Sequence, residues 1–370
     1  MEKELWSTED FRKKLRDIVN IDSGSDNKEG VGRVGKYLIK ECERIGLNVE
    51  SYDGDTRFFA SHNTDEEYDF LFVGHMDTVF SEGTVKERPY TEEGTMAYGP
   101  GVADMKAGDI MIVFLAEKLV KNHPEISFCV AFNGDEEVGS DESKKWLDEI
   151  AVKAKYVLVF EPGREGNAFV KSRKGSGNIL AKFRGISSHA GIAPEKGANA
   201  ITEMGKWVVE LSSLQNLEKG TSISAGYVNG GGPINVIPDY AEVGFDFRFK
   251  DPLEAEKIVD KANELAMNVS VSGVSVDYEI PEIWPAMNPN EKTLELIDRI
   301  NKKAVELEMN IGWVETGGAS DANHISSIGS AVICGCGPCG GNLHSDQEFL
   351  MLDSIENRLN LLYSTIVDIS

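Results

Sequence analysis

Histidine and acidic residues follow directly after short apolar segments of the chain, where they could bind metal ions and activate water. His75 and Asp77 follow the run "DFLFVG", and the adjacent pair Glu136 and Glu137 follows the run "ISFCVAFN". Imidazole and carboxylate groups are suitable ligands for zinc. These residue types at the ends of apolar runs therefore indicate a metal centre with hydrolytic chemistry.

The same pattern recurs further along the chain. The complete set of candidates is His75, Asp77, Asp104, Glu136, Glu137, Glu161 and His344. Five carboxylates meeting at one place would repel one another unless cations were present. Three carboxylates and one hydroxide would balance two divalent ions, about 3.5–4 Å apart with one carboxylate shared between them. One glutamate of the Glu136–Glu137 pair would then remain as a base, while Asp77 could hydrogen-bond the far ring nitrogen of His75.

Each of these features also has an ordinary structural interpretation. A His-x-Asp sequence occurs by chance, and neighbouring glutamates are usually part of a solvated surface. Their order along the chain and their positions after successive apolar runs are what favour a metal site over these ordinary interpretations.

The apolar runs predict the fold that would position these residues. Four runs, "DFLFVG", "ISFCVAFN", "YVLVF" and "SAVICG", are continuous rather than alternating, and a helical stretch separates the first two. This pattern is typical of parallel strands buried on both faces. We predict an α/β domain with a doubly wound, mostly parallel sheet. Ligands bind at the carboxyl ends of such strands, where the candidate residues would converge.

The middle of the chain has a different order of predicted strands and helices. Residues 172–281 read as strand, helix, strand, strand, helix and strand, the βαββαβ order of a ferredoxin-like unit. We therefore predict an inserted domain at 172–281, with 1–171 and 282–370 forming the catalytic domain.

Composition excludes several classes of partner. The chain of 370 residues has a net charge of -24, which disfavours nucleic acid and anionic membranes. The N-terminal segment reads as an amphipathic helix capped at Ser7 or Thr8, and we find no signal peptide or apolar run of membrane-spanning length. Five cysteines, an odd number, favour reduced thiols and a cytoplasmic location.

Seven motifs, in order over nearly the whole chain, resemble those of the di-zinc amidohydrolases and exopeptidases, a family that includes acetylornithine deacetylase, succinyl-diaminopimelate desuccinylase, aminoacylase and glutamate carboxypeptidase. The motifs are "GHMDTV" (74–79), "GPGVADMKAG" (99–108), "NGDEEVGS" (133–140), "EPG" (161–163), "SSHAGIAPEKGANAI" (187–201), "NVIPDYAEVGFDFR" (235–248) and "HSDQEFL" (344–350). The second, fourth and fifth are most similar to the glutamate carboxypeptidase, or carboxypeptidase G-like, branch.

The resemblance implies a role for each candidate. His75 and Glu161 would hold one zinc ion, Glu137 and His344 the other, and Asp104 would bridge them, with Co²⁺ or Mn²⁺ as possible substitutes. Glu136 would be the general base, and Asp77 would orient a metal ligand. The Asp104–Met105 peptide falls where the family has a cis bond.

The resemblance also implies roles for residues of the inserted domain. His189 would stabilise the oxyanion in the partner subunit's site, which implies a homodimer formed through this domain. Arg248 would bind the substrate carboxylate, and Asn235 would add a polar contact. Without the resemblance, His189 reads as a packed strand-end residue and Arg248 as a surface residue.

We therefore expect a metallo-exopeptidase that hydrolyses a small peptide or an N-acyl amino acid, most simply as a glutamate-type carboxypeptidase. An N-acyl-amino-acid deacylase, a desuccinylase or an aminotripeptidase would use the same metal site, and a catalytically inactive metal-binding dimer is a more remote alternative. Cys334, Cys336 and Cys339 are close in sequence, but a fourth ligand for a structural zinc is not apparent, so buried thiols are the simpler interpretation.

Overall fold

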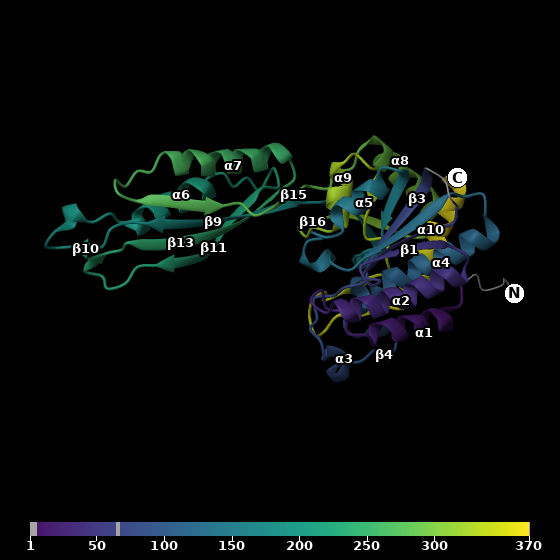
Figure 1. The fold of residues 1–370 in the computed structure, drawn as a ribbon. Coiled ribbons are helices and arrows are strands. Elements are labelled where there is room, and N and C mark those ends of the chain that lie inside the picture. The colour runs from purple at the N-terminus through teal and green to yellow at the C-terminus, as the bar shows by residue number, and fades with distance from the viewer. Residues whose placement is uncertain (1–5, 64–66, 370) are drawn as a thin grey trace. The chain divides into compact units, whose positions relative to one another are not determined.

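The computed structural model describes residues 6–63 and 67–369, which form two compact units. The first comprises Met1–Ser172, Pro289–Glu315 and Ser320–Ser370, and the second comprises Arg173–Asn288 and Thr316–Ala319. Figure 1 shows the elements of both. The expected N-terminal helix is present as α1 (Thr8–Val19), and the Ser7 side chain caps it by accepting a hydrogen bond from Asp10 N. Residues 1–5 of the segment for which this helix was expected lie outside the described residues.

The main sheet of the first unit has six strands in the order β1-β2-β6-β3-β7-β17. Their bounds are β1 (Asn48–Tyr52), β2 (Arg57–Ser61), β3 (Tyr68–His75), β6 (Phe128–Asn133), β7 (Ala154–Val159) and β17 (Val332–Ile333). The strands β6, β3, β7 and β17 run parallel, and they contain the four apolar runs. The sequence did not predict the antiparallel strands β1 and β2, of which β1 is largely exposed. The sheet is mostly parallel, as expected.

Helices lie on both faces of this sheet (Figure 1). Their bounds, beyond α1, are α2 (Lys28–Arg44), α3 (Thr84–Glu87), α4 (Ala107–Asn122), α5 (Lys144–Ala151), α8 (Glu291–Glu306), α9 (Asp321–Ser327) and α10 (Ser354–Ile369). Helix α4 packs against β3 and is contacted by α1, α2 and α10, so most of its side chains are buried. A helix that is apolar on nearly all sides is expected in such a position.

Two small sheets complete the first unit. Strand β8 (Ala168–Arg173) pairs with β16 (Gly312–Thr316), and a second sheet contains β4 (Thr91–Glu93), β5 (Met96–Tyr98), β18 (Gly340–Gly341) and β19 (Phe349–Met351). The pairing of β19 with β5 brings the turn that contains His344 close to Val102–Lys106, an irregular helical turn. These short strands therefore help to position two candidate ligands.

The second unit has the predicted ferredoxin-like architecture. Its order is β9 (Gly175–Arg184), α6 (Ala200–Ser212), β11 (Ser222–Gly230), β13 (Tyr240–Phe249), α7 (Pro252–Met267) and β14 (Ser275–Glu279). The strands form an antiparallel sheet in the order β11-β13-β9-β14. A short strand β15 (Ile283–Trp284) also pairs with β9, which places the segment up to Asn288 in this unit.

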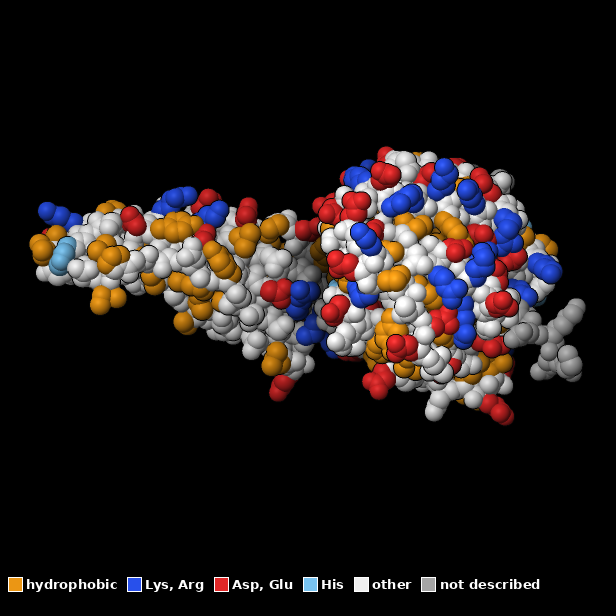
Figure 2. Space-filling model, turned by 90° about the horizontal axis from the view of Figure 1, so that it is seen from below, with side chains coloured by type: hydrophobic (Ala, Val, Ile, Leu, Met, Phe, Trp, Pro, Cys, Tyr) orange, Lys and Arg blue, Asp and Glu red, His pale blue; other side chains and the backbone are white. Residues whose placement is uncertain are grey.

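The two faces of this sheet differ. Along β9, Ile179 and Ala181 are buried against the helices, whereas Leu180 and Lys182 are exposed on the opposite face. Figure 2 looks onto the face that α6 and α7 leave uncovered, and hydrophobic side chains gather there. At the edge strand β11, Tyr227 and Val228 are both more than half exposed.

Candidate active site

The parallel strands of the first unit bring the acidic and histidine residues together at their carboxyl ends. His75 is the last residue of β3, and Glu161 follows β7 by two residues. Glu136 and Glu137 begin a short turn, Glu136–Val138, directly after β6. This is the convergence that the order of the strands predicted.

Asp104 lies between the two histidines. Its Oδ1 is 3.3 Å from His75 Nε2, and its Oδ2 is 3.2 Å from His344 Nε2. One carboxylate therefore presents one oxygen to each imidazole, although the three residues are far apart in sequence. The Asp104–Met105 peptide bond is cis, as the resemblance implied.

The glutamates surround this arrangement. Glu137 Oε2 lies 3.2 Å from His344 Nε2. Glu161 Oε1 and Glu136 Oε2 lie 3.8 and 3.9 Å from His75 Nε2. Among the described residues, two groups have potential ligand atoms close enough to share an ion: His75, Asp104 and Glu137, and His75, Glu136 and Glu161. His75, Asp104 and Glu161 are buried, Glu136 and Glu137 are partly exposed, and the His344 side chain is half exposed.

The electrostatics of the cluster favour positive charge. Burial lowers the pKa of His75, but contacts with Asp104 and Asp77 outweigh burial and raise the pKa well above its ordinary value. Hydrogen bonds to the carboxylates of Asp104 and Glu137 raise the pKa of His344 to about 10. Burial raises the pKa of Glu136, with Glu161 adding to this effect and His75 opposing it. The clustered carboxylates favour positive charge on the neighbouring histidines. Divalent cations bound at the same place would supply this positive charge and stabilise the cluster.

Asp77 connects His75 to the turn that carries the two glutamates. Its backbone oxygen is 3.1 Å from His75 Nδ1, and its carboxylate accepts hydrogen bonds from the backbone N–H groups of Glu136 (3.3 Å) and Glu137 (3.1 Å). Ser25 Oγ donates a further hydrogen bond of 2.7 Å to the same carboxylate. Asp77 is fully buried, so it fixes both the imidazole and the turn.

Glu348 is a further acidic residue of the site that was not predicted from the sequence. Its buried carboxylate accepts hydrogen bonds from the backbone N–H groups of Gly101 (3.3 Å), Ala103 (2.8 Å) and Asp104 (3.1 Å). Glu348 thereby ties the segment that bears Asp104 to the turn that bears His344. The only signal in the sequence was an acidic residue four positions after His344.

The candidate residues of the second unit lie within that unit, where His189 and Asn235 are neighbours. The short strands β10 (Ser188–His189) and β12 (Val236–Ile237) pair, and the backbone N–H of Ala190 donates to the backbone oxygen of Asn235. His189 Nδ1 accepts from the backbone N–H groups of Gly191 and Ile192, so Nε2 is the ring nitrogen that remains to donate. Both His189 and Asn235 are exposed.

Arg248 lies on the uncovered face of β13, where Asp246 accepts hydrogen bonds from its Nε (3.1 Å) and Nη2 (2.8 Å). The guanidinium therefore already has a carboxylate partner within its own strand.

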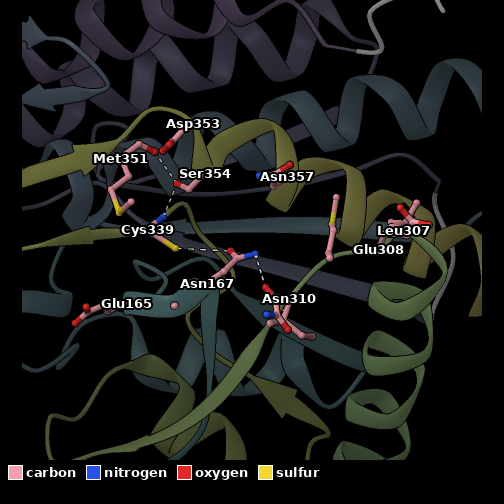
Figure 3. Close-up of a pocket in the computed structure, with 13 residues that line it drawn as sticks. Glu165, Asn167, Leu307, Glu308, Asn310, Cys339, Met351, Asp353, Ser354 and Asn357 are labelled. Carbon is pink, nitrogen blue, oxygen red and sulfur yellow. Dashed lines mark hydrogen bonds between the residues drawn. The ribbon is translucent and has the colours of Figure 1, made fainter.

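A hollow of about 800 Å³ in the first unit lies apart from these residues. It is lined by the 165–167 turn, the 307–311 segment, Cys339 and residues from Met351 to Asn357, and Figure 3 shows that Asn167 joins Cys339 to Asn310 across it. None of the candidate ligands lines it.

All five cysteines of the chain are buried free thiols, and Cys339 Sγ donates to Arg164 O at 3.4 Å.

Comparison with known proteins assigns the chain to a family. Residues 71–368 match the model of peptidase family M20/M25/M40. The chain belongs to this family. The fold is thus that of an M20 hydrolase.

Individual M20 relatives cover almost the whole chain. Carboxypeptidase G2 of Pseudomonas sp. (strain RS-16) is 30% identical over 96% of this chain and 88% of its own length. The structure of aminopeptidase PepT from Bacillus cereus superposes with a TM-score of 0.83 at 22% identity, covering 98% of both chains. The YXEP protein of Bacillus subtilis, described as a dinuclear metal-binding M20 peptidase, superposes with a TM-score of 0.71 at 14% identity, covering 98% of both chains.

Proposed function

We propose that this protein is a two-metal exopeptidase of the carboxypeptidase type, which hydrolyses an amide or peptide bond and releases an amino acid with a free carboxylate. The observation that carries the proposal is the position of Asp104, with one oxygen near each of two histidines and with Glu137 and Glu161 beside them. The 30% identity to carboxypeptidase G2 supports C-terminal glutamate as the first substrate to test.

The residues present fit a pair of divalent ions. Asp104 Oδ1 and Glu137 Oε1 are buried and make no hydrogen bond to described residues, as expected of oxygens that would bind cations. His75 and Glu161 would hold one ion, Glu137 and His344 the other, and Asp104 both. The mixed imidazole and carboxylate donor set suits zinc, with cobalt or manganese as substitutes. When bound, such ions polarise the scissile carbonyl and lower the pKa of water.

Glu136 is the base in this proposal. Its carboxylate is close to His75, and burial raises its pKa, which favours the uptake of a proton. Glu136 takes a proton from the attacking water and returns it to the leaving nitrogen as the C–N bond breaks. Asp77 keeps Glu136 in place through its backbone N–H.

His189 and Arg248 supply the contacts to substrate. The Nε2–H of His189 can donate to the oxyanion that develops on the carbonyl oxygen. Arg248 binds the carboxylate of the substrate, and it must share its guanidinium with Asp246 to do so. Asn235 lies beside His189 and offers a further polar contact.

The second unit also supports a homodimer in which each subunit lends its His189 to the other's metal centre. Strand β11 lies at the edge of the sheet, and its Tyr227 and Val228 are exposed on it, as expected of a strand that pairs with a second copy.

The free thiols favour a reducing compartment such as the cytoplasm. No helix in the described part of the chain has the length and apolar character needed to span a bilayer.

The test is a substrate panel. The zinc-loaded protein is incubated with dipeptides, tripeptides and N-acyl amino acids, and the released amines are identified by mass spectrometry. Preferential release of C-terminal glutamate supports the proposal. Release of a different residue, or of an N-terminal residue from tripeptides, would instead indicate a deacylase or an aminotripeptidase, and no hydrolysis by protein that binds two ions would contradict the proposed activity.

A further inference from the structure

The turn that carries Glu136 and Glu137 is held at both ends by one buried carboxylate that the proposed reaction does not use. Asp321, the first residue of α9, accepts a hydrogen bond from Ser140 Oγ at 2.5 Å through Oδ1. Its other oxygen, Oδ2, accepts from Asn133 Nδ2 at 3.0 Å. Asn133 is the last residue of β6 and Ser140 ends the turn, so the two oxygens hold the two ends of the segment 134–139.

The backbone of the turn needs such support. Gly139 and Ser140 both adopt left-handed conformations, with φ of 109° and 55°. Glycine adopts this conformation at little cost, whereas a residue with a side chain is strained there unless its surroundings hold it. Ser140 is fully buried, and its hydroxyl donates its hydrogen bond to Asp321. The hydrogen bond thus supports, together with the backbone hydrogen bond from Ser140 N–H to Asp135 O, the conformation of the turn.

Asp321 is in turn held by His324. His324 Nε2 lies 3.1 Å from Asp321 Oδ1, and His324 Nδ1 lies 2.7 Å from Asp148 Oδ1 on α5. Asp321 and His324 are almost completely buried, so water does not compete for these contacts. A buried carboxylate with an imidazole partner and two further donors is fully engaged and has a fixed orientation.

We propose that Asp321, supported by His324, is a positioning residue that sets the geometry of Glu136 and Glu137 by holding both ends of their turn. Asp77 binds the backbone at the start of the same turn, so the turn is held from both sides. This inference rests on the proposed function in so far as Glu136 is the base. The ordering of the turn itself does not depend on that function.

The test separates positioning from general stability. Ser140→Ala removes the hydroxyl that contacts Asp321 and leaves the Asp321–His324 pair intact, whereas Asp321→Asn weakens the whole network. Matched controls are Ser354→Ala, which removes another buried hydroxyl of the first unit, and Glu203→Gln, which neutralises a buried carboxylate that accepts hydrogen bonds from Ser270 in the second unit. All five proteins, including the wild type, are compared in the zinc-loaded state.

The first readout is amide hydrogen exchange followed by mass spectrometry, which is independent of activity. Exchange in the peptide that covers the turn should accelerate at least about tenfold in Ser140→Ala and Asp321→Asn, because the turn opens more often, and should stay unchanged in both controls. The second readout is steady-state kinetics, in which kcat should fall by about 10–100-fold while KM changes by less than about twofold.

Unchanged exchange in the turn in Ser140→Ala would overturn the inference even if the melting temperature falls, and so would faster exchange with a wild-type kcat. If the wild-type protein hydrolyses no member of the substrate panel, the proposed function fails, but the exchange data still decide whether Asp321 orders the turn.

Discussion

The carboxylate of Asp77 accepts a hydrogen bond from the backbone N–H of Glu136, at 3.3 Å, across 59 residues of sequence. Asp77 also contacts His75 Nδ1 through its backbone oxygen, so one residue holds a candidate metal ligand and the candidate base in register. Asp77 therefore links the candidate ligand to one side of the turn that carries the candidate base.

Replacement of this carboxylate by an amide tests that link. Each oxygen of Asp77 accepts from one backbone N–H, of Glu136 or of Glu137, so in Asp77→Asn, where one oxygen becomes an NH2 donor, one of these two N–H groups loses its acceptor. We expect kcat/KM and the affinity for metal to fall by about 10–100-fold, the usual effect of removing a group that orients a ligand. Kinetics and metal titration by calorimetry measure both quantities. Wild-type values for both would show that Asp77 has no orienting role.

Removal of metal should destabilise the first unit. Without cations, the buried carboxylates around Asp104 repel one another, and ions that bind only the folded state add about 2.7 kcal/mol each at a hundredfold excess over Kd. We expect a chelator to abolish hydrolysis and to lower the melting temperature measured by differential scanning calorimetry, and zinc, cobalt or manganese to restore both. An unchanged melting temperature after verified removal of metal would count against the ligand set.

Mixing two inactive variants tests the shared active site. Glu136→Gln removes the base and His189→Ala removes the proposed oxyanion donor, so each homodimer should be inactive. If His189 serves the partner subunit, dimers that exchange subunits after mixing regain one complete site, and about a quarter of all sites become active. The released amine measures this recovery. Exchange of subunits without recovery would mean that His189 does not act across the dimer.

The stability of the first unit should depend on pH through His324. Burial lowers the pKa of His324, but contacts with Asp148 and Asp321 outweigh burial and raise the pKa to about 9. Because the folded-state pKa lies above the unfolded value near 6.5, the stabilisation is complete below pH 6.5 and is lost as the pH rises through about 9.

Compared with His324→Gln, the free energy of unfolding of the wild type should therefore lose on the order of 3 kcal/mol over this range of pH. Denaturant titrations at several pH values measure the difference. Parallel pH profiles for the two proteins would show that folding does not raise the pKa of His324.

The sequence predicted those parts of the fold in which the pattern of apolar and polar residues along one segment indicates how that segment is buried. The continuous apolar runs of β3, β6 and β7 indicated strands buried on both faces, and the βαββαβ order indicated the second unit. Strands β1 and β18 could not be predicted in this way. Strand β1 is polar and largely exposed, and β18 has only two residues, so both depend on partners distant in sequence.

The site shows the same division. His75 and Glu136 were predictable from residue type and from their positions at strand ends, and the resemblance supplied their expected roles. Glu348, Asp321 and His324 were not predicted to contribute, because a buried carboxylate or imidazole is informative only when the groups that face it are known. The backbone N–H groups that Glu348 accepts from lie more than 240 residues away in sequence.

The most direct test of the central claim compares metal content with turnover in Glu136→Gln. Glu136 lies among potential ligand atoms, so the measurement must distinguish a base from a ligand. The account predicts two bound ions per subunit, as in the wild type, and a kcat reduced by about 10²–10⁴-fold, with Glu142→Gln as an exposed control of wild-type behaviour. A wild-type kcat in Glu136→Gln, or the loss of one ion in parallel with activity, would contradict it.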